Sequence, residues 1–306
     1  MTLANFPSVS IIIPVYEDAE RLNLCLNALS HQTYPRSNFE IIVIDNSSPS
    51  IDLIKAVINQ YDVDIFDIET QPGSYAARNR GLDLAQGEII AFTDADCIPE
   101  TDWLEQGVLE MIHQSLDMAT GGIQVFPKDK NRPNLIERYQ MATAFPQIKY
   151  MKQHRGGVTA NVLVYKDVIE KVGKFDAVLK SGGDLEWGHR IFLAGFKQAY
   201  IASAIVHHPA RDSWQSLIKK NTRTAGGIYD QKINSKKSWL IRNLIFLWHI
   251  VTDIISYKYA FDESFGNPRV SGFKKSFEVF KITLILKHFS AWEKIKIHFG
   301  ETSKRI

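Results

Sequence analysis

Two aspartates stand one residue apart in the stretch EIIAFTDADCIPE, residues 88–100. Five residues that suit a buried strand run directly into Asp94 and Asp96, where charge is costly unless it is paired or coordinated. Such a pair suits Mg²⁺ or Mn²⁺, which takes one or two protein carboxylates and completes its shell with diphosphate and water. On spacing alone, a solvated turn with an aspartate as helix cap is the commoner explanation.

The elements around this pair predict an α/β fold. Apolar runs that suit strands, at residues 8–15, 39–45 and 88–92, alternate with helical patterns at 19–29, 50–60 and 74–87. Such alternation indicates a mainly parallel, doubly wound sheet. Ligands bind at the carboxyl ends of its strands, and polar residues follow three strands, at 14–17, 45–48 and 94–96.

The composition bounds the class of protein. The chain has 306 residues, of which 45% are hydrophobic, enough for one large domain and a smaller extension. Cys25 and Cys97 make neither a disulfide framework nor a metal cluster, and the first residues lack a secretory pattern. We therefore expect a reducing, cytoplasmic location.

The charge divides the chain in two. Residues 211–306 hold 18 Lys and Arg against 8 Asp and Glu, a net charge of +10, whereas residues 1–210 carry a net charge of −8. Four of the six tryptophans lie in the basic segment, where the strand and helix alternation also ends. We expect a catalytic domain at 1–210 with an acidic, cation-requiring site, and a helical extension at 211–306 that meets something anionic.

Four ordered motifs resemble those of the family 2 glycosyltransferases. They are VSIIIPVYEDAERL, FEIIVIDNSSPS, PGSYAARNRGLDLAQGEIIAFTDADCIPE and GKFDAVLKSGGDLEWGHRIFLAGF, and the resemblance covers roughly residues 8–210. It implies the Rossmann-like GT-A fold and inverting transfer of a sugar from a nucleotide-diphosphate donor, with a UDP-sugar favoured. Manganese or magnesium is the implied cofactor, and a polysaccharide, glycolipid or other surface glycan is the implied product.

The resemblance places the donor beside the first strands. Tyr16 and Glu17 would meet the base, although the family usually carries Asn at the position of Glu17. Asp45 would hydrogen-bond the base; the alternative is an Asx-turn cap for the next helix. Arg78, near a helix start that favours phosphate, would bind the donor phosphates, unless it forms a surface ion pair.

The same resemblance gives a metal set and a base. Asp96 would bind the cation, Asp94 the ribose or a metal-bound water, and His208 rather than His207 would be the third ligand. Asp184 matches the catalytic base, with a helix N-cap as its alternative role. Residues with acceptor or orienting roles are Glu186, Trp187 and Asn161, and Arg190 matches the family's arginine. Gly183 departs from the family pattern, which has Glu there.

The basic extension suits a membrane surface. The charge-free part of residues 239–257 is much shorter than the roughly 20 residues that a span requires. At 273–289, one helical face carries Phe273, Phe277, Phe280 and Leu284, and lysines lie mostly off it (Lys274, Lys275, Lys281 and Lys287). Such a helix can lie in an anionic bilayer surface at the inner face of the membrane, near a glycan or lipid-linked acceptor. Packing on the catalytic domain or on a second subunit is the alternative, and no nucleic-acid-binding motif accompanies the charge.

Two other functions compete with this interpretation. A sugar-phosphate nucleotidyltransferase needs a glycine-rich, basic signature near the first strand, which IIIPVYEDAERL lacks. A catalytically silent nucleotide-sugar or glycan-binding protein would not need the intact set of Asp94, Asp96 and Asp184. The sequence therefore favours a metal-dependent glycosyltransferase.

Overall fold

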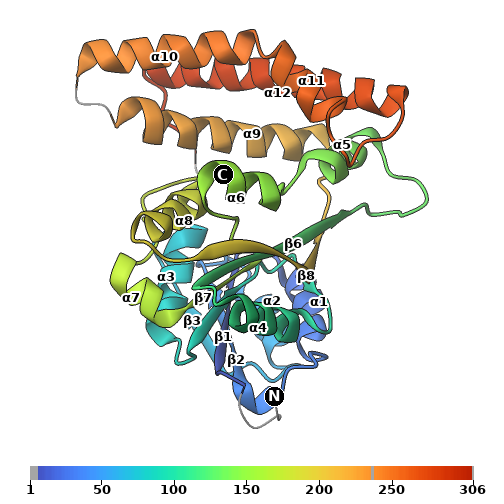
Figure 1. Cartoon of the computed structure of the whole chain (residues 1–306), viewed down its shortest axis with the longest axis vertical. Coiled ribbons are helices and arrows are strands. Elements are labelled where there is room, and N and C mark those ends of the chain that lie inside the picture. Colours follow the sequence, from blue (N-terminus) through green and yellow to red (C-terminus); the bar gives the residue numbers. More distant parts are fainter. Residues whose placement is uncertain (1–5, 236–237, 305–306) are drawn as a thin grey trace. The chain divides into compact units, whose positions relative to one another are not determined.

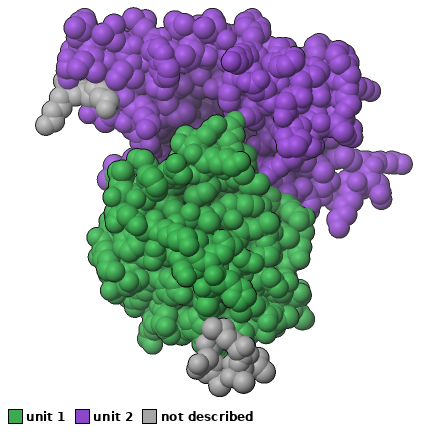
Figure 2. Space-filling view, in the orientation of Figure 1, with its two compact units in different colours: residues 1–124, 145–177, 183–208 green, residues 125–144, 178–182, 209–306 purple. Residues whose placement is uncertain are grey.

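The structure, a computed structural model, describes residues 6–235 and 238–304. The chain divides into two compact units, coloured separately in Figure 2. Unit 1 comprises residues 1–124, 145–177 and 183–208, and unit 2 comprises residues 125–144, 178–182 and 209–306. The last of these divisions falls between residues 208 and 209, and the predicted domain boundary at residue 210 stays a prediction. Residues 125–144 and 178–182 were not predicted to group with the C-terminal segment.

An eight-stranded sheet in the order β3-β2-β1-β4-β7-β6-β8-β5 organises unit 1 (Figure 1). Its strands are β1 (Val9–Val15), β2 (Phe39–Asp45), β3 (Ile65–Ile68), β4 (Ile89–Phe92), β5 (Ile98–Pro99), β6 (Met118–Phe126), β7 (Val162–Tyr165) and β8 (Gln198–Pro209). Strands β3, β2, β1 and β4 are parallel, as predicted. Beyond β4 the sheet is mixed, because β7 runs antiparallel to both β4 and β6.

Helices cover both faces of this sheet (Figure 1). The helices of unit 1 are α1 (Ala19–Leu29), α2 (Ile51–Ile58), α3 (Ser74–Leu84), α4 (Trp103–Gln114), α6 (Gln147–His154), α7 (Lys166–Val172) and α8 (Gly183–Leu193), with a short 3₁₀ turn η2 (Arg36–Asn38). In α1 the residues Leu22, Cys25, Leu26 and Leu29 recur at helical spacing and are buried against the alternate side chains of β1. The central strands are buried on both faces, which explains their continuous apolar runs.

Unit 2 is helical. Its elements are α5 (Leu135–Thr143), α9 (Trp214–Ile228), the π-helix η3 (Tyr229–Asn234), α10 (Trp239–Ile254), α11 (Tyr257–Ser264) and α12 (Phe273–His298). Helix α12 packs against α5, α9, α10 and α11 and is the centre of the unit. Helix α5 begins at a capping box, in which Asn134 and Glu137 satisfy each other's backbone donors.

An ion cluster ties α10 to α12. Asp253 accepts from Lys294 at 2.6 Å and from Lys287 at 3.3 Å, and the Lys294 side chain is only 2% exposed. Lys287, which was predicted to meet lipid headgroups, also contacts Asp253, and its contact with headgroups stays a prediction. Burial raises the pKa of Asp253, but the two ammonium groups outweigh it and leave the pKa below its ordinary value.

Within residues 6–235 and 238–304, no single helix has both the length and the apolar character to cross a membrane. The pair α10 and α11, bent by 51° at their junction, meets the criterion together by length and composition.

Candidate active site

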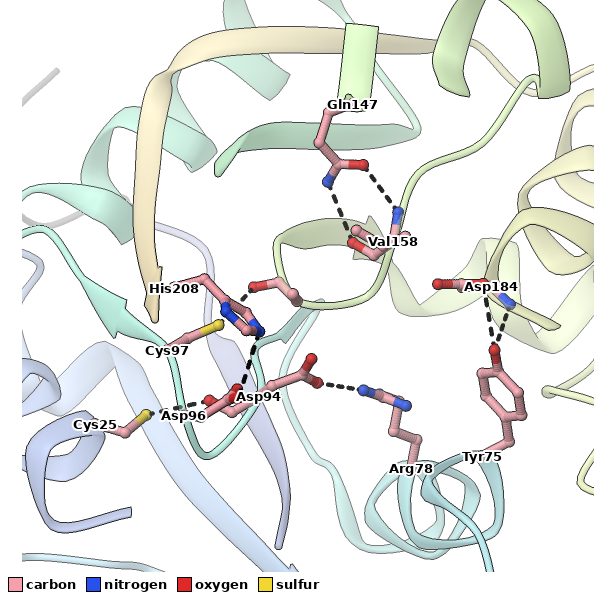
Figure 3. Close-up of polar contacts among 11 residues, drawn as sticks. Cys25, Tyr75, Arg78, Asp94, Asp96, Cys97, Gln147, Val158, Asp184 and His208 are labelled. Carbon is pink, nitrogen blue, oxygen red and sulfur yellow. Dashed lines mark hydrogen bonds and ion pairs between the residues drawn. The ribbon is translucent and has the colours of Figure 1, made fainter. Parts of the chain in front are cut away.

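The loop after β4 carries the two aspartates of the opening motif. Strand β4 is fully buried between β1 and β7, so the chain leaves the sheet at a fixed point and both aspartates follow at its edge. Asp94 forms an ion pair with Arg78 from α3 (Figure 3). The Arg78 side chain is only 4% exposed, and its Nε lies buried without a hydrogen-bond partner. A buried guanidinium with a vacant donor is suited to a further anion.

Asp96 faces His208 at the end of β8. The distance from His208 Nε2 to Asp96 Oδ2 is 3.4 Å, and the imidazole is buried against the Phe145 ring. His207 points to the other side of β8 and pairs with Glu100 at 2.9 Å. The structure therefore places His208, rather than His207, beside the aspartate, as the alternation along the strand predicts.

The predicted metal set is only partly assembled. Asp94 turns to Arg78, and across the described ranges no group of three or more His, Cys, Asp or Glu side chains is gathered to hold a metal ion. Asp96 Oδ2 and His208 Nε2 are near enough to contact one cation, and magnesium commonly needs no more than one or two protein ligands beside a diphosphate.

The loop is strongly electronegative, which suits a cation. Burial, followed by the charges of Asp96 and Asp94, raises the pKa of the Cys25 thiol far above its usual range. Burial also raises the pKa of Asp18; Arg21 opposes the rise and the charge of Asp96 adds to it. Because Asp94 is paired with Arg78 whereas Asp96 faces His208, the residues present fit a divalent cation at Asp96 better than at Asp94.

Asp184 lies in the first turn of α8, where Tyr75 from α3 reaches it. The Tyr75 hydroxyl donates to Asp184 Oδ1 at 3.3 Å and accepts from the Gly183 amide at 2.9 Å. The Leu185 amide also donates to Oδ1, at 3.0 Å. Burial raises the pKa of Asp184, while Arg78 and these hydrogen bonds oppose the rise. A carboxylate with a raised pKa that is held in a fixed orientation is suited to act as a general base.

Gly183 has a physical reason to depart from the family pattern. A Cβ placed on Gly183 would lie 2.8 Å from the Tyr75 ring, closer than real Cβ atoms approach other groups. The Tyr75 ring, stacked on Phe175 at 5.7 Å, fills the space that a larger residue needs. The tyrosine ring can therefore occupy this place only because residue 183 is glycine. In this place its phenol contacts Asp184, the candidate base.

The two acceptor or orienting candidates on α8, Trp187 and Glu186, both have partners inside the fold. Trp187 is fully buried, donates from Nε1 to the Gly173 carbonyl at 2.9 Å and packs on Phe175. The indole does not reach the surface, so this burial favours the orienting role for Trp187 over contact with the acceptor, and both stay predictions. Glu186 pairs with Arg190 at 2.8 Å, so the two charged residues that match the family pattern contact each other.

Asn161 is held by hydrogen bonds inside the fold, and its predicted contact with sugar stays a prediction. Its side chain is fully buried and its oxygen accepts from Trp103 Nε1 at 2.9 Å. Its amide nitrogen donates to the Gly122 and Ala204 carbonyls, at 2.8 and 2.9 Å. The side chain thus connects β6, β8 and α4 and retains no donor for a ligand.

The predicted nucleotide side lies at the ends of β1 and β2. Tyr16 and Glu17 are exposed there, and Glu17 has a φ of 49°. Asp45 is fully buried, and both its oxygens accept from Ser48, one from the amide at 2.8 Å and one from the hydroxyl at 2.5 Å. This is the Asx-turn arrangement, and contact between Asp45 and a base stays a prediction.

Three residues around the candidate site, Ser48, Gln147 and Tyr75, were assigned no role from the sequence. Ser48 joins two loops, because its hydroxyl also accepts from the Glu17 amide at 2.8 Å. Gln147 holds the loop before β7 through Val158, accepting from its amide at 3.0 Å and donating to its carbonyl at 3.3 Å. Tyr75 was not predicted because its partner lies 109 residues away.

Comparison with known proteins identifies relatives of the chain. The family pattern described as Glycosyl transferase family 2 matches residues 10–173. Glycosyltransferase AglE of Haloferax volcanii is 37% identical over 230 residues, covering 73% of this chain and 74% of that protein. A Methanococcus voltae enzyme is 24% identical over 225 residues, covering 69% and 70%; its name is dolichyl N-acetyl-alpha-D-glucosaminyl phosphate 3-beta-D-2,3-diacetamido-2,3-dideoxy-beta-D-glucuronosyltransferase.

A solved structure supports the fold. The mannosyltransferase PcManGT from Pyrobaculum calidifontis, determined with GDP-Man and Mn²⁺, superposes with a TM-score of 0.64 at 16% identity. The match covers 98% of this chain and 89% of that one. The predicted α/β architecture of the GT-A type, with a helical C-terminal region, is confirmed.

Proposed function

The chain belongs to glycosyl transferase family 2 and is a glycosyltransferase, and we propose that it transfers a sugar, with inversion, from a nucleotide-diphosphate donor to an acceptor hydroxyl with the help of a divalent cation. One observation supports this most strongly. Buried Arg78 pairs with Asp94 on one side and lies near enough to Asp184 to oppose the rise in its pKa on the other. Figure 3 shows this guanidinium between the acidic loop and the Tyr75–Asp184 pair.

The leaving-group side is built from Arg78, Asp96 and His208. Asp96 and His208 would hold Mn²⁺ or Mg²⁺, which when bound supplies Lewis-acid stabilisation of the departing diphosphate. Arg78 would donate from its free Nε to a donor phosphate. Both contacts act on charge that grows as the bond to the diphosphate breaks, so they favour the transition state over the bound donor.

The acceptor side is built from Asp184. The acceptor oxygen forms a bond to the anomeric carbon, the bond from that carbon to the diphosphate breaks, and the hydroxyl proton passes to an Asp184 oxygen. Attack opposite to the leaving group inverts the anomeric centre. Tyr75 and the Leu185 amide orient the carboxylate, and one Asp184 oxygen has no hydrogen bond to either of them.

The proposed donor and acceptor classes come from the sequence resemblance and from the names of relatives. A UDP-sugar remains the predicted donor, with a GDP-sugar as the competitor raised by PcManGT. A glycan or lipid-linked acceptor is proposed because the Methanococcus voltae relative is named for a dolichyl phosphate substrate. The product would enter a polysaccharide, glycolipid or other surface glycan.

Attachment to the inner face of a membrane through residues 211–306 is also proposed, with a corrected apolar face. On α12, Phe280 and Leu284 are partly buried, so the predicted face is only half available. Helix α10 instead exposes a stripe without charge, which we call the α10 stripe (Leu240, Ile241, Leu244, Leu247, Trp248, Val251, Ile254 and Ile255). An apolar helical face of this kind is suited to the boundary between headgroups and acyl chains.

Release of nucleoside diphosphate tests the proposed reaction. Full-length protein is incubated with a panel of UDP- and GDP-sugars, with and without Mn²⁺ and with soluble glycan or lipid-phosphate acceptors. We expect one donor to give release that needs the metal and rises with the right acceptor. Binding of a donor without release under any condition would favour the silent binding protein, which the family comparison does not support.

A further inference from the structure

A small cavity is lined entirely by residues of unit 2, none of which was assigned to the candidate active site. It has a volume of about 160 Å³ and lies between α5, the segment before α12, and α12 itself. Its wall is mostly apolar, formed by side chains such as Leu135, Met141, Val270, Val279 and Ile282. The volume equals that of about five water-sized groups, which suits a segment of hydrocarbon chain and not a whole lipid.

Four charged residues line the same cavity, and their charges do not sum to zero. Arg138 and Glu278 neutralise each other, with contacts of 3.0 and 3.1 Å. Arg269 donates from Nη1 to the Ala144 carbonyl at 2.9 Å, a bond that fixes the guanidinium but leaves its charge. In the described part of the chain, neither Arg269 nor Lys275 has a carboxylate partner. An apolar hollow with two uncompensated cations is suited to an anion attached to a hydrocarbon.

Exposed apolar side chains continue from the cavity along the start of α12. Phe273 is 76% exposed and Phe277 is 44% exposed, and Lys275 lies between them in the sequence. Leu135 and Met141, which line the cavity, are themselves partly exposed. A hydrocarbon chain that leaves the cavity would therefore meet further apolar surface and not water alone.

We propose that this cavity binds a single-chain anionic lipid, with a phosphate monoester at Arg269 and Lys275 and a segment of its chain among Leu135, Val270 and Ile282. The proposal rests on the proposed function in one respect only, since a lipid phosphate is the class of compound that would carry a lipid-linked acceptor. Arg269 supplies a fixed planar donor, and Lys275 supplies a mobile point charge. Inorganic phosphate lacks the hydrocarbon part and a neutral alcohol lacks the charged part. Each should therefore bind more weakly than a ligand that has both parts.

Decyl phosphate is the probe for this site, titrated calorimetrically into full-length protein below its micelle concentration. We expect it to bind at least about tenfold more tightly than inorganic phosphate or decanol. Dihexanoyl phosphatidylglycerol, a two-chain phosphodiester, tests a bilayer lipid as the source and should bind more weakly. Equal affinity for inorganic phosphate would overturn the role of the chain, and equal affinity for the phosphatidylglycerol would overturn the single-chain monoester.

Two neighbouring lysines allow a matched test, because Lys275 lines the cavity and Lys274 does not. Lys275→Gln should weaken binding of decyl phosphate by about three- to tenfold, whereas Lys274→Gln, with the same charge change outside the cavity, should not. Met141→Trp should weaken it further by occupying the cavity from its exposed edge, with thermal unfolding used to confirm the fold. Equal effects of the two lysine changes would overturn the site.

Failure here is separable from failure of the proposed function. Asp96→Ala should bind decyl phosphate as the unchanged protein does, because Asp96 belongs to the sheet unit. Binding at the cavity in a protein that transfers no sugar would reject the reaction and keep the lipid site. Transfer in a protein whose cavity binds no decyl phosphate would reject the lipid site and keep the reaction.

Discussion

At the scale of single residues, substitution of Asp184 tests the proposed transfer of the acceptor proton most directly. Asp184→Asn keeps the size of the side chain and removes the proton acceptor. We expect kcat to fall by roughly 10²–10⁴, the usual contribution of a general base, while donor affinity changes little. Steady-state kinetics with separate donor titration measures both quantities. Turnover close to that of the unchanged enzyme would eliminate Asp184 as the base.

Tyr75 predicts a shift in the pH profile. Its hydroxyl donates to the ionised Asp184 carboxylate, so it favours the charged form and lowers the pKa of that group. Tyr75→Phe removes this bond, so the pKa of Asp184 should rise. The acid limb of kcat/KM should move to higher pH, with activity recovered at alkaline pH. A uniform loss at all pH values would show that Tyr75 only supports the fold.

Asp96 predicts the cation dependence. Asp96→Ala removes the carboxylate nearest His208 and should abolish Mn²⁺- or Mg²⁺-dependent binding of donor diphosphate, with the fold intact. Calorimetry with nucleoside diphosphate, with and without metal, measures the effect. Asp62→Ala, which changes a surface carboxylate that is 83% exposed, is the matched control and should bind normally. Normal diphosphate binding by the Asp96 variant would refute the assignment.

The candidate site was only partly predictable from the sequence, for physical reasons. Asp94, Asp96 and Asp184 stand out because carboxylates follow buried strands or match an ordered motif. Trp187 lies in the same motif as Asp184, and Asn161 was assigned from the same resemblance, yet their polar atoms are used inside the fold. Whether a polar atom is free depends on partners distant in sequence, and these become visible only in three dimensions.

At the scale of elements, prediction succeeded where the pattern is local. The periodic apolar residues of α1 and the continuous runs of β1 and β2 gave the right elements within about a residue. The antiparallel position of β7 beside β4 was not predicted, because strand pairing depends on the return path of the chain. Helix α12 reaches His298, well beyond the predicted end at 289, because an amphipathic pattern does not continue clearly through its buried charges.

The ion cluster between α10 and α12 predicts a large loss of stability. Asp253→Asn would leave Lys294 buried without a charge partner, and breaking such a pair costs about 3–5 kcal/mol. We expect the midpoint of urea unfolding to fall accordingly. Asp262→Asn on exposed α11 makes the same chemical change and should alter the free energy of unfolding by less than about 0.5 kcal/mol. Equal stability of both variants would mean that the cluster contributes little.

At the scale of the whole molecule, the uneven charge and the α10 stripe make a joint prediction about membranes. Residues 211–306 carry a net charge of +10, and the stripe exposes eight apolar side chains. Salt screens the attraction of lysines to anionic headgroups but not the insertion of apolar groups. Full-length protein should therefore sediment with anionic vesicles, bind neutral vesicles more weakly and detach only partly at high salt.

Point variants test this better than truncation. A chain cut near residue 210 would leave α5 without α12, against which it packs, so lost binding could reflect lost folding. Leu244→Asp with Leu247→Asp adds two charges to the exposed stripe and leaves the buried side of α10 unchanged. We expect this pair to abolish the salt-resistant part of vesicle binding, because a carboxylate at the acyl boundary is costly. Gln215→Asp with Ser271→Asp, at exposed polar positions, adds the same charge and should weaken only the salt-sensitive part. If both pairs bind vesicles equally, the stripe does not enter the membrane. A lipid-free change of oligomeric state in the leucine pair would then identify the stripe as a subunit interface.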